Sequence, residues 1–433
     1  MGSQWLALQP QRPILSKQKP MASLKSFLNW PSFTAEEADA VQKVLLSNKV
    51  NYWTGQECRL FEDEFAKWCG SQYAVALANG TLALDVALQA LGIKAGDEVI
   101  VTPRTFIASI SCVVNIGAIP VFADVDLNSG NITPDSIAKV ITPKTRAIIC
   151  VHLGGWPCDM DGIMNLANLH GIKVIEDCAQ AHGALYKGKS VGTIGHVGAW
   201  SFCQDKIMTT GGEGGMVTTN DESLWRVMWA YKDHGKSYAA VYEREHPPGY
   251  RWIHESFGTN WRMLEMQAAI GRIQLQRMAN WTARRNENVK ILTEQLSILL
   301  GANSLLRLPV FACNSGCSQS SQKCASRESG QCRHACYKYY LYLNPQKIVS
   351  GWDRDRIIEA INDAGVPCYS GSCSEVYLER AFNATSFRPS FRLPNAQELG
   401  ETTLMFLVHP TISVEKMHEA GIIIRQVLSK ISQ

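Results

Sequence analysis

The sequence predicts an α/β fold, with a large domain built on a mostly parallel seven-stranded sheet and a smaller α+β domain after it. Two observations predict this class. Between residues 74 and 219, short apolar runs alternate with helix-like stretches, and the runs are apolar throughout, as strands buried on both faces require. The length of 433 residues also suits two domains better than one.

The predicted strands of the large domain share this continuous apolar character. They are Ala74–Ala78, Glu98–Thr102, Val121–Val125, Ala147–Val151, Lys173–Glu176, Ala199–Phe202 and Gly215–Thr219. The helix-like stretches between the earlier strands are Thr81–Leu91, Ile107–Ile116, Thr133–Val140 and Met160–Leu169. Strands that alternate with helices form a parallel sheet through right-handed crossovers.

The segments on either side complete the predicted domains. Residues 1–22 are polar and rich in proline, so we expect a poorly ordered N-terminal arm, followed by a helix over Thr34–Leu46. The large domain then covers residues 23–290 and the small domain residues 291–433. The remaining predicted elements are helices over Trp261–Met278, Arg284–Leu299, Arg354–Ala364 and Thr411–Ser432 and a strand over Tyr337–Leu343.

A Cys/Ser-rich insert over residues 312–336 interrupts the small domain. Its two Cys-x-x-x-Cys pairs, with His334 nearby, permit a zinc site. Their spacing matches no standard zinc motif, so a loop is the preferred interpretation and we predict no metal.

Composition excludes several classes of function. A formal charge of +3 over this length argues against nucleic-acid binding. No apolar stretch is long enough to span a membrane, and residues 1–20 do not resemble a secretory signal. The 14 cysteines are scattered, several of them through apolar segments, as reduced thiols are, so we expect a cytoplasmic protein.

Two glycine-rich segments invite a nucleotide-binding interpretation. Gly183–Ser190 matches the P-loop pattern literally, but the glycines that follow it, Gly192, Gly195 and Gly198, would not support the helix that a P-loop requires. We therefore predict a hairpin, and a P-loop nucleotidase is the disfavoured alternative. Gly211–Gly215 precedes a strand and predicts a tight turn.

Polar residues follow three predicted strands at the same edge of the sheet. Gly80 and Thr81 open a helix, where backbone N–H groups and a hydroxyl suit a phosphate. Asp177 and Lys206 follow two later strands, and Ser201 would add a second hydroxyl. A lysine that can form a Schiff base, together with a carboxylate that keeps a pyridine nitrogen protonated, suits pyridoxal 5'-phosphate.

These residues occur within a longer ordered set of motifs that resembles the DegT/StrS family of pyridoxal-phosphate sugar aminotransferases, which have the aspartate aminotransferase fold (fold type I). The resemblance extends from about Trp30 to the C-terminal helix. The motifs are Asn79–Thr81, Thr105–Phe106, Glu176–Gly183, Ser201–Phe202 with Lys206, Gly212–Gly215 and Gly258–Met263.

The resemblance implies a role for each matching residue. Lys206 would form the Schiff base and Asp177 would bind the pyridine nitrogen. Phe106 would stack on the ring and Gln180 would reach its phenolic oxygen. The phosphate would be held by Gly80, Thr81, Ser201 and, from the other subunit of a homodimer, Asn260.

The resemblance also implies the reaction. An amino acid, with L-glutamate as the usual donor, would supply an amino group to the keto group of a nucleotide-linked deoxysugar. Arg251 and Arg262 could meet the diphosphate, and His182 could contact substrate or simply pack in the core. The alternatives are a desulfurase-like enzyme that uses Cys373 and a catalytically idle relative.

Overall fold

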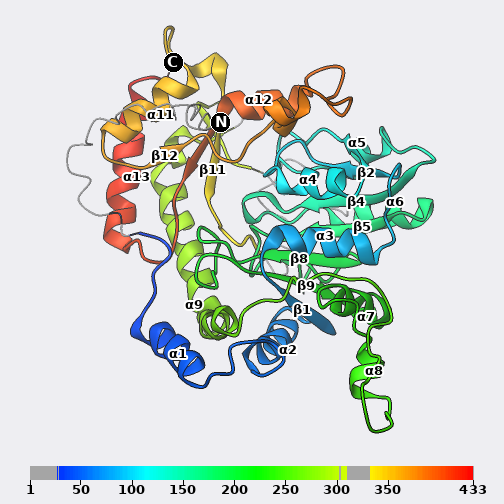
Figure 1. Ribbon diagram of the computed structural model, residues 1–433. Helices are drawn as coiled ribbons and strands as arrows, with labels where there is room; N and C mark the ends of the chain where they lie inside the picture. The colour runs from blue at the N-terminus through cyan, green and yellow to red at the C-terminus, as the bar shows by residue number, and fades with distance from the viewer. Residues whose placement is uncertain (1–26, 28, 302–303, 310–331, 433) are drawn as a thin grey trace, which may run out of the picture.

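The computed structural model describes residue 27 and residues 29–301, 304–309 and 332–432 (Figure 1). The predicted N-terminal arm and residues 312–331 of the predicted insert lie outside these ranges. In the described part, no helix is long and apolar enough to cross a membrane.

The large sheet contains all seven predicted strands. They are β1 (Tyr73–Leu77), β2 (Glu98–Val101), β3 (Ile119–Phe122), β4 (Thr145–Val151), β5 (Lys173–Asp177), β8 (Val197–Ser201) and β9 (Gly215–Thr219). Their order is β1-β9-β8-β5-β4-β2-β3. Only β9 runs antiparallel to its two neighbours, and the other pairs are parallel. The predicted mostly parallel seven-stranded sheet is therefore confirmed.

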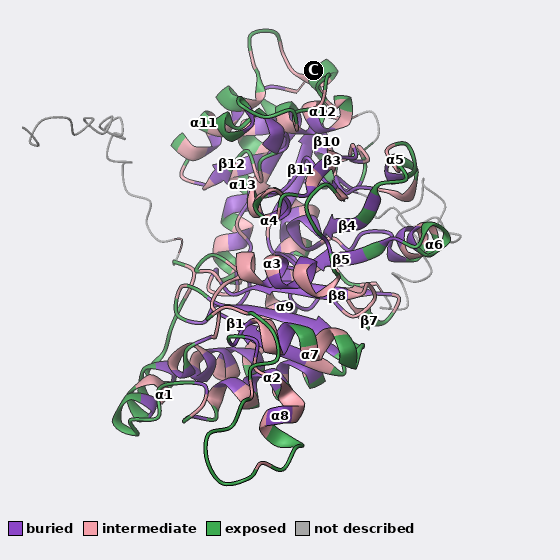
Figure 2. Cartoon of the chain, turned by 45° about the vertical axis from the view of Figure 1, so that its right-hand side comes forward, coloured by how far each residue is buried: buried purple, intermediate pink, exposed green. Residues whose placement is uncertain are grey.

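Helices cover both faces of this sheet, which leaves its strands buried (Figure 2). One face is covered by α3 (Gly80–Ala90), α4 (Ala108–Asn115) and α7 (Glu222–Tyr231). The other is covered by α2 (Glu57–Cys69), α5 (Pro134–Ala138), α6 (Met160–His170) and the first part of α9 (Glu265–Gln295). Alternate residues of a strand enter opposite cores: Ile149 joins the first cluster and Ile148 the second.

Helix α9 corrects the prediction of two helices over Trp261–Met278 and Arg284–Leu299. It is one helix of 31 residues, because residues 279–283 contain neither glycine nor proline to end it. Three helices pack along it: α2, α1 (Ala35–Leu46) and α13 (Val414–Ser429). The helix crosses the domain boundary predicted after residue 290.

The small C-terminal unit has the predicted α+β character. Its antiparallel sheet has the order β10-β11-β13-β12. The strands are β10 (Leu306–Arg307), β11 (Tyr339–Leu343), β12 (Cys368–Tyr369) and β13 (Thr403–Phe406). Helices α11 (Arg354–Asp363) and α13 pack on it, and α12 (Pro394–Thr402) leads into β13. Short 3-10 helices lie at Leu153–Gly155, Ser297–Leu299, Pro345–Lys347, Val376–Leu378 and Arg380–Phe382, and a short helix α8 at Tyr238–Tyr242.

The segment that matches the P-loop pattern forms the predicted hairpin, β6 (Leu185–Tyr186) and β7 (Lys189–Ser190). No helix follows it: the chain turns at residues 191–196 and enters β8. Without a helix N-terminus, this segment lacks the dipole and the free N–H groups that a nucleotide phosphate requires.

Candidate active site

Four strands of the large sheet, β1, β2, β5 and β8, run in the same direction, so their carboxyl ends lie at one edge. The segments that leave these ends carry most of the predicted cofactor-binding residues. The edge therefore collects groups that are far apart in the sequence, as is usual for ligand sites of α/β sheets.

Asp177 ends strand β5 and is only 6% exposed. Its Oδ2 accepts a hydrogen bond of 2.8 Å from the Ser109 hydroxyl on α4, and its Oδ1 accepts one of 3.1 Å from the Ala179 N–H. Burial raises the pKa of this carboxyl, while those hydrogen bonds and the positive charge of Lys206 oppose the rise. The Asp177 carboxylate thus lies within electrostatic reach of Lys206 and is held in a fixed orientation.

Lys206 lies in the turn after β8, and its backbone is bonded on both sides. Its N–H donates to the Cys203 carbonyl at 3.1 Å, and its carbonyl accepts a hydrogen bond of 2.7 Å from the indole N–H of Trp30. The ammonium lies 3.5 Å from Asp205 Oδ1 and 5.5 Å from the ring centre of Tyr337. Lys206 is therefore held at the edge of the sheet, its backbone by Cys203 and Trp30 and its ammonium beside Asp205 and Tyr337.

The junction of β1 and α3 has the form of a phosphate seat. Asn79 caps α3 by accepting a hydrogen bond of 3.0 Å from the Leu82 N–H. Gly80 begins the helix so close to Ser201 that a β-carbon on it would lie 2.5 Å from the Ser201 β-carbon. The helix N-terminus, the Ser201 hydroxyl and Thr81 thus lie together, and this combination suits a phosphate dianion.

Phe106 and Gln180 present complementary groups at the same edge. The Phe106 side chain is 69% exposed, which is unusual for an aromatic ring that follows a buried strand and suits stacking on a flat ligand. Gln180 is buried, and its Oε1 accepts a hydrogen bond of 2.8 Å from the Gly154 N–H. Because Oε1 accepts this bond, the amide NH2 group remains as the donor that Gln180 can offer.

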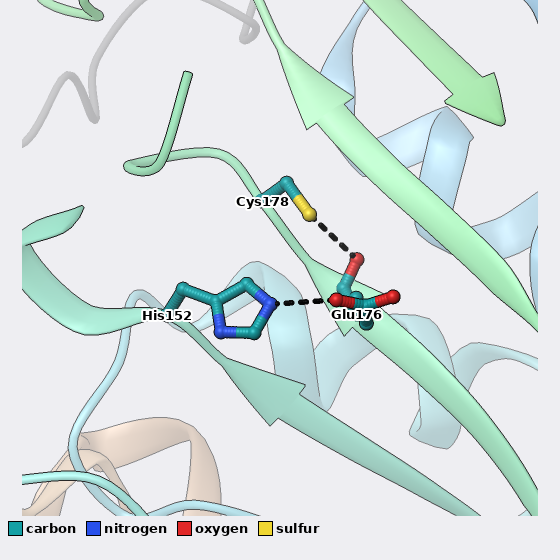
Figure 3. A group of neighbouring side chains, drawn as sticks. All are labelled: His152, Glu176 and Cys178. Atoms are coloured by element: carbon teal, nitrogen blue, oxygen red, sulfur yellow. Dashed lines mark hydrogen bonds and ion pairs between the residues drawn. The ribbon is translucent and has the colours of Figure 1, made fainter. Parts of the chain in front are cut away.

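Behind Asp177, the neighbouring Glu176 is completely buried and saturated with hydrogen bonds (Figure 3). Its Oε1 accepts from the N–H groups of Ile194 and Gly195 at 2.8 and 2.6 Å. Its Oε2 accepts from the Gly192 N–H at 2.8 Å and contacts His152 Nε2 at 3.0 Å. The glycine-rich turn after the hairpin therefore binds a carboxylate of the protein itself.

His152 is the donor in its contact with Glu176. Its Nδ1 accepts a hydrogen bond of 3.0 Å from the Cys158 N–H, so the ring proton resides on Nε2. Burial raises the pKa of Glu176, but His152 and the backbone amides outweigh it and lower that pKa overall. Glu176, His152 and Cys178 offer ligand atoms within 4.8 Å of one another. The hydrogen bonds of Glu176 account for its burial without a metal ion.

The residues that we expected to contact substrate do not gather at this edge in the same way. His182 is completely buried against Trp200 and Phe202, which favours packing in the core over contact with substrate. Arg262 is already paired with buried Asp233 at 2.5 Å. Arg251 is exposed in the segment after α8.

Several residues at the site escaped the sequence analysis. Ser109 holds Asp177, Trp30 holds the backbone of Lys206, and Asp205 contacts its ammonium and accepts a hydrogen bond from the Tyr337 hydroxyl. Only Asp205 carried a signal, because it precedes the lysine directly. Trp30 and Tyr337 come from distant segments that no local pattern connects to Lys206.

Comparison with known proteins identifies the family of the chain. Residues 31–424 match the DegT/DnrJ/EryC1/StrS aminotransferase family. The chain belongs to this family. The family that the motifs resembled is confirmed, and with it the fold type I architecture and the pyridoxal-phosphate-dependent aminotransferase activity.

Relatives of this aminotransferase act in sugar biosynthesis. GDP-perosamine synthase of Escherichia coli O157:H7 is 41% identical over 274 residues, which cover 62% of this chain and 71% of the relative. The spore coat polysaccharide biosynthesis protein SpsC of Bacillus subtilis is 32% identical over 398 residues, covering 92% and 96%. An aminotransferase from Psychrobacter cryohalolentis, known from its X-ray structure, is 64% identical, with a TM-score of 0.89 and coverage of 94% and 100%.

The residues present fit the cofactor of the family. The missing side chain of Gly80 lets the N-terminus of α3 lie directly against Ser201, so the backbone N–H groups of the helix lie beside the hydroxyl groups of Thr81 and Ser201. A buried carboxylate, an amine and an exposed aromatic ring lie at the same edge of the sheet. Pyridoxal phosphate needs a seat for a dianion, a partner for its ring nitrogen and an amine for its aldehyde, and this donor set offers all three.

Proposed function

We propose that this aminotransferase moves an amino group from an amino acid, L-glutamate in the first instance, to the keto group of a nucleotide-linked deoxysugar, and that it does so in the cytoplasm. The observation that carries the proposal is the convergence of Lys206, buried Asp177 and the Gly80–Ser201 seat at one edge of the sheet. The activities of the relatives support the class of acceptor.

Pyridoxal phosphate, when bound, carries the amino group between the two substrates and accepts electrons from the substrate carbon. Lys206 Nζ is the group that takes the proton from the α-carbon of the donor and returns a proton later in the reaction. Asp177 holds the proton of the ring nitrogen, with its own orientation fixed by Ser109 and Ala179. The seat of Gly80, Thr81 and Ser201 fixes the position of the phosphate.

The absorption spectrum of the purified protein tests the site. We expect a visible band that borohydride removes, and we expect Lys206→Ala to lack it. Lys189→Ala, which removes an exposed lysine from the hairpin, is the matched control and should keep the band. Amino-group exchange between L-glutamate and a panel of UDP-, GDP- and dTDP-linked keto sugars then tests the reaction. A protein that binds the cofactor but aminates none of them would refute the proposed reaction and leave the desulfurase-like and catalytically idle alternatives.

The desulfurase alternative requires a reactive thiolate at Cys373. Desolvation raises the pKa of this thiol, and the carboxylates of Glu375 and Glu379 act in the same direction. The thiolate is therefore disfavoured at neutral pH, which weighs against the alternative. The desulfurase alternative would be supported if the wild type releases sulfide from L-cysteine and Cys373→Ser does not.

We also propose a homodimer in which Asn260 completes the phosphate seat of the partner. Asn260 is exposed and follows a segment with large exposed apolar side chains: Tyr250, Trp252 and Phe257 are 74%, 82% and 99% exposed. This segment extends from the body of the protein beyond α8 (Figure 1), as an arm that reaches another subunit would.

A complementation experiment tests the shared site. Lys206→Ala and Asn260→Ala each inactivate a homodimer, but a mixed dimer has one site that carries neither change. Mixing the two inactive proteins under conditions of subunit exchange should therefore restore up to about a quarter of the activity. No recovery, with exchange verified by light scattering and mass spectrometry of tagged subunits, would refute the sharing of residues.

A further inference from the structure

Lys338 is a second amine beside the site. It lies directly before strand β11 and is half-buried. Its Nζ lies 4.7 Å from the ring centre of Tyr337, and Lys206 Nζ lies 5.5 Å from the same ring centre. Because Tyr337 also donates a hydrogen bond to Asp205, which contacts Lys206, a single aromatic side chain connects the two amines.

The charges around Lys338 do not balance. Two other cations act on its ammonium, Lys206 and Arg285, and among the described residues one carboxylate, that of Asp205, offsets them. Arg285 is completely buried and donates to the backbone carbonyls of Cys336 and Tyr337, so it brings no anion with it. Burial lowers the pKa of Lys338 to about 8, and Lys206 and Arg285 act in the same direction. The amine is therefore still mainly charged at neutral pH.

Lys338 also makes no ion pair within 4.0 Å in the part of the chain that the structure describes, whereas Asp205 is shared with Lys206 and Tyr337. A half-buried ammonium without a close carboxylate attracts an anion that can reach it. A ligand that brings one carboxylate to this position would offset the excess positive charge.

The proposed reaction supplies such an anion. An amino donor must bring its amine to the position of Lys206 Nζ, so its carboxylates arrive within a few ångströms of that atom. Building on the proposed function, we propose that Lys338 Nζ binds a carboxylate of the amino donor. It would thereby favour acidic donors, which bear a negative charge in addition to the α-carboxylate, over neutral ones.

The binding of glutarate to the holoenzyme tests this assignment, because glutarate has two carboxylates but no amine or ketone that could react. Calorimetry should show that Lys338→Met raises the dissociation constant of glutarate at least tenfold, whereas Lys338→Arg changes it by no more than about threefold. Lys347→Met, which removes a half-buried lysine nine residues further along the same unit, is the matched control and should leave it unchanged.

Chemical labelling gives a readout that is independent of activity. Acetic anhydride should modify Lys338 in the wild type, and glutarate should protect it, as measured by mass spectrometry of the peptides. In kinetics, Lys338→Met should raise the KM for L-glutamate while the KM for the keto sugar stays unchanged. The visible absorption of the cofactor checks that each variant has folded around it.

The results separate the two proposals. If Lys338→Met binds glutarate as the wild type does, the assignment of Lys338 is overturned and the proposed function stands. If the variant instead loses affinity for the nucleoside diphosphate that the wild type binds best among UDP, GDP and dTDP, Lys338 serves the acceptor and the assignment is again overturned. If the wild type neither binds glutarate nor exchanges nitrogen with L-glutamate, the proposed donor is wrong and the role of Lys338 falls with it.

Discussion

Replacing Glu176 by glutamine should destabilise the protein strongly, although the two side chains have nearly the same size. Each carboxylate oxygen of Glu176 accepts two hydrogen bonds. In either orientation of a glutamine amide, its NH2 group would therefore replace one of these acceptors and face two N–H donors. His152 cannot adapt by exchanging its ring proton, because its Nδ1 already accepts from the Cys158 N–H. A hydrogen bond to a charged acceptor contributes about 1.5–3 kcal/mol, so the loss of two should cost about 3–6 kcal/mol. That is a large part of an ordinary stability of about 5–15 kcal/mol.

Urea denaturation at pH 7, followed by tryptophan fluorescence at fixed protein and cofactor concentrations, measures this cost. Glu243→Gln is the matched control, because Glu243 is an exposed carboxylate that pairs with Arg226 at 2.8 Å. Its loss should cost less than about 1 kcal/mol. If Glu176→Gln lowers the unfolding free energy no more than the control does, the stabilising role of the four hydrogen bonds to Glu176 is refuted.

The pH dependence of the same variant has a defined sign. The folded pKa of Glu176 is lowered below 4.5, so its contribution is present above that pH and is lost as the pH falls through the folded value. The difference in unfolding free energy between wild type and Glu176→Gln should therefore be constant from pH 5 to 8 and shrink below about pH 4.5. A difference that grows on acidification would contradict the assigned ionisation.

Three further changes probe other parts of the site. Gly80→Ala adds a methyl group 2.5 Å from the Ser201 β-carbon, and overpacking of about 1–3 kcal/mol should raise the dissociation constant of the cofactor about 5- to 150-fold in a titration of apoenzyme. Trp30→Phe keeps an aromatic ring but loses the 2.7 Å bond to the backbone carbonyl of Lys206, the proposed catalytic lysine, so kcat should fall about two- to tenfold, whereas Trp281→Phe beside it should not have this effect. Burial lowers the pKa of His182 to about 3, so the wild type should lose up to about 5 kcal/mol of stability between pH 6.5 and 3, and His182→Phe should lose less over that range in urea titrations. The first expectation is refuted if Gly80→Ala binds the cofactor as the wild type does, and the second if Trp30→Phe and Trp281→Phe lower kcat equally. The third is refuted if the wild type and His182→Phe lose equal stability between pH 6.5 and 3.

The sequence predicted the large sheet well because its signal is local. Each strand is a short run of apolar residues, and its polar neighbours mark the end at which a parallel sheet presents its ligands. Taken singly, Asp177 and Lys206 suited a surface ion pair better, and only the ordered motifs joined them with Ser201 into one candidate site. Helices α2 and α7 escaped notice, since their apolar faces lie among many charged and aromatic residues.

The groups that reach Lys206 from a distance could not be predicted in this way. Trp30 is 176 residues away from Lys206, and Tyr337 is 132 residues away from Asp205. Their contacts depend on how α9 and the small domain fold back on the sheet, and no periodicity in the chain encodes that distance. The two interpretations of His182 stayed open for the same reason: its motif neighbours lie at the candidate site, while its own ring faces the core between Trp200 and Phe202.

Strand β5 gives two successive acids opposite tasks. Glu176 faces the turn at residues 192–195 and binds its backbone N–H groups, while Asp177 faces α4 and the candidate active site. Because side chains alternate along a strand, a deletion or insertion of one residue upstream within β5 would turn each acid to the opposite face of the sheet, even though both would remain present. The number of residues in β5 therefore matters as much as their identity. Insertions or deletions in this strand should be tolerated far less than substitutions of Lys173, which lies at its exposed end.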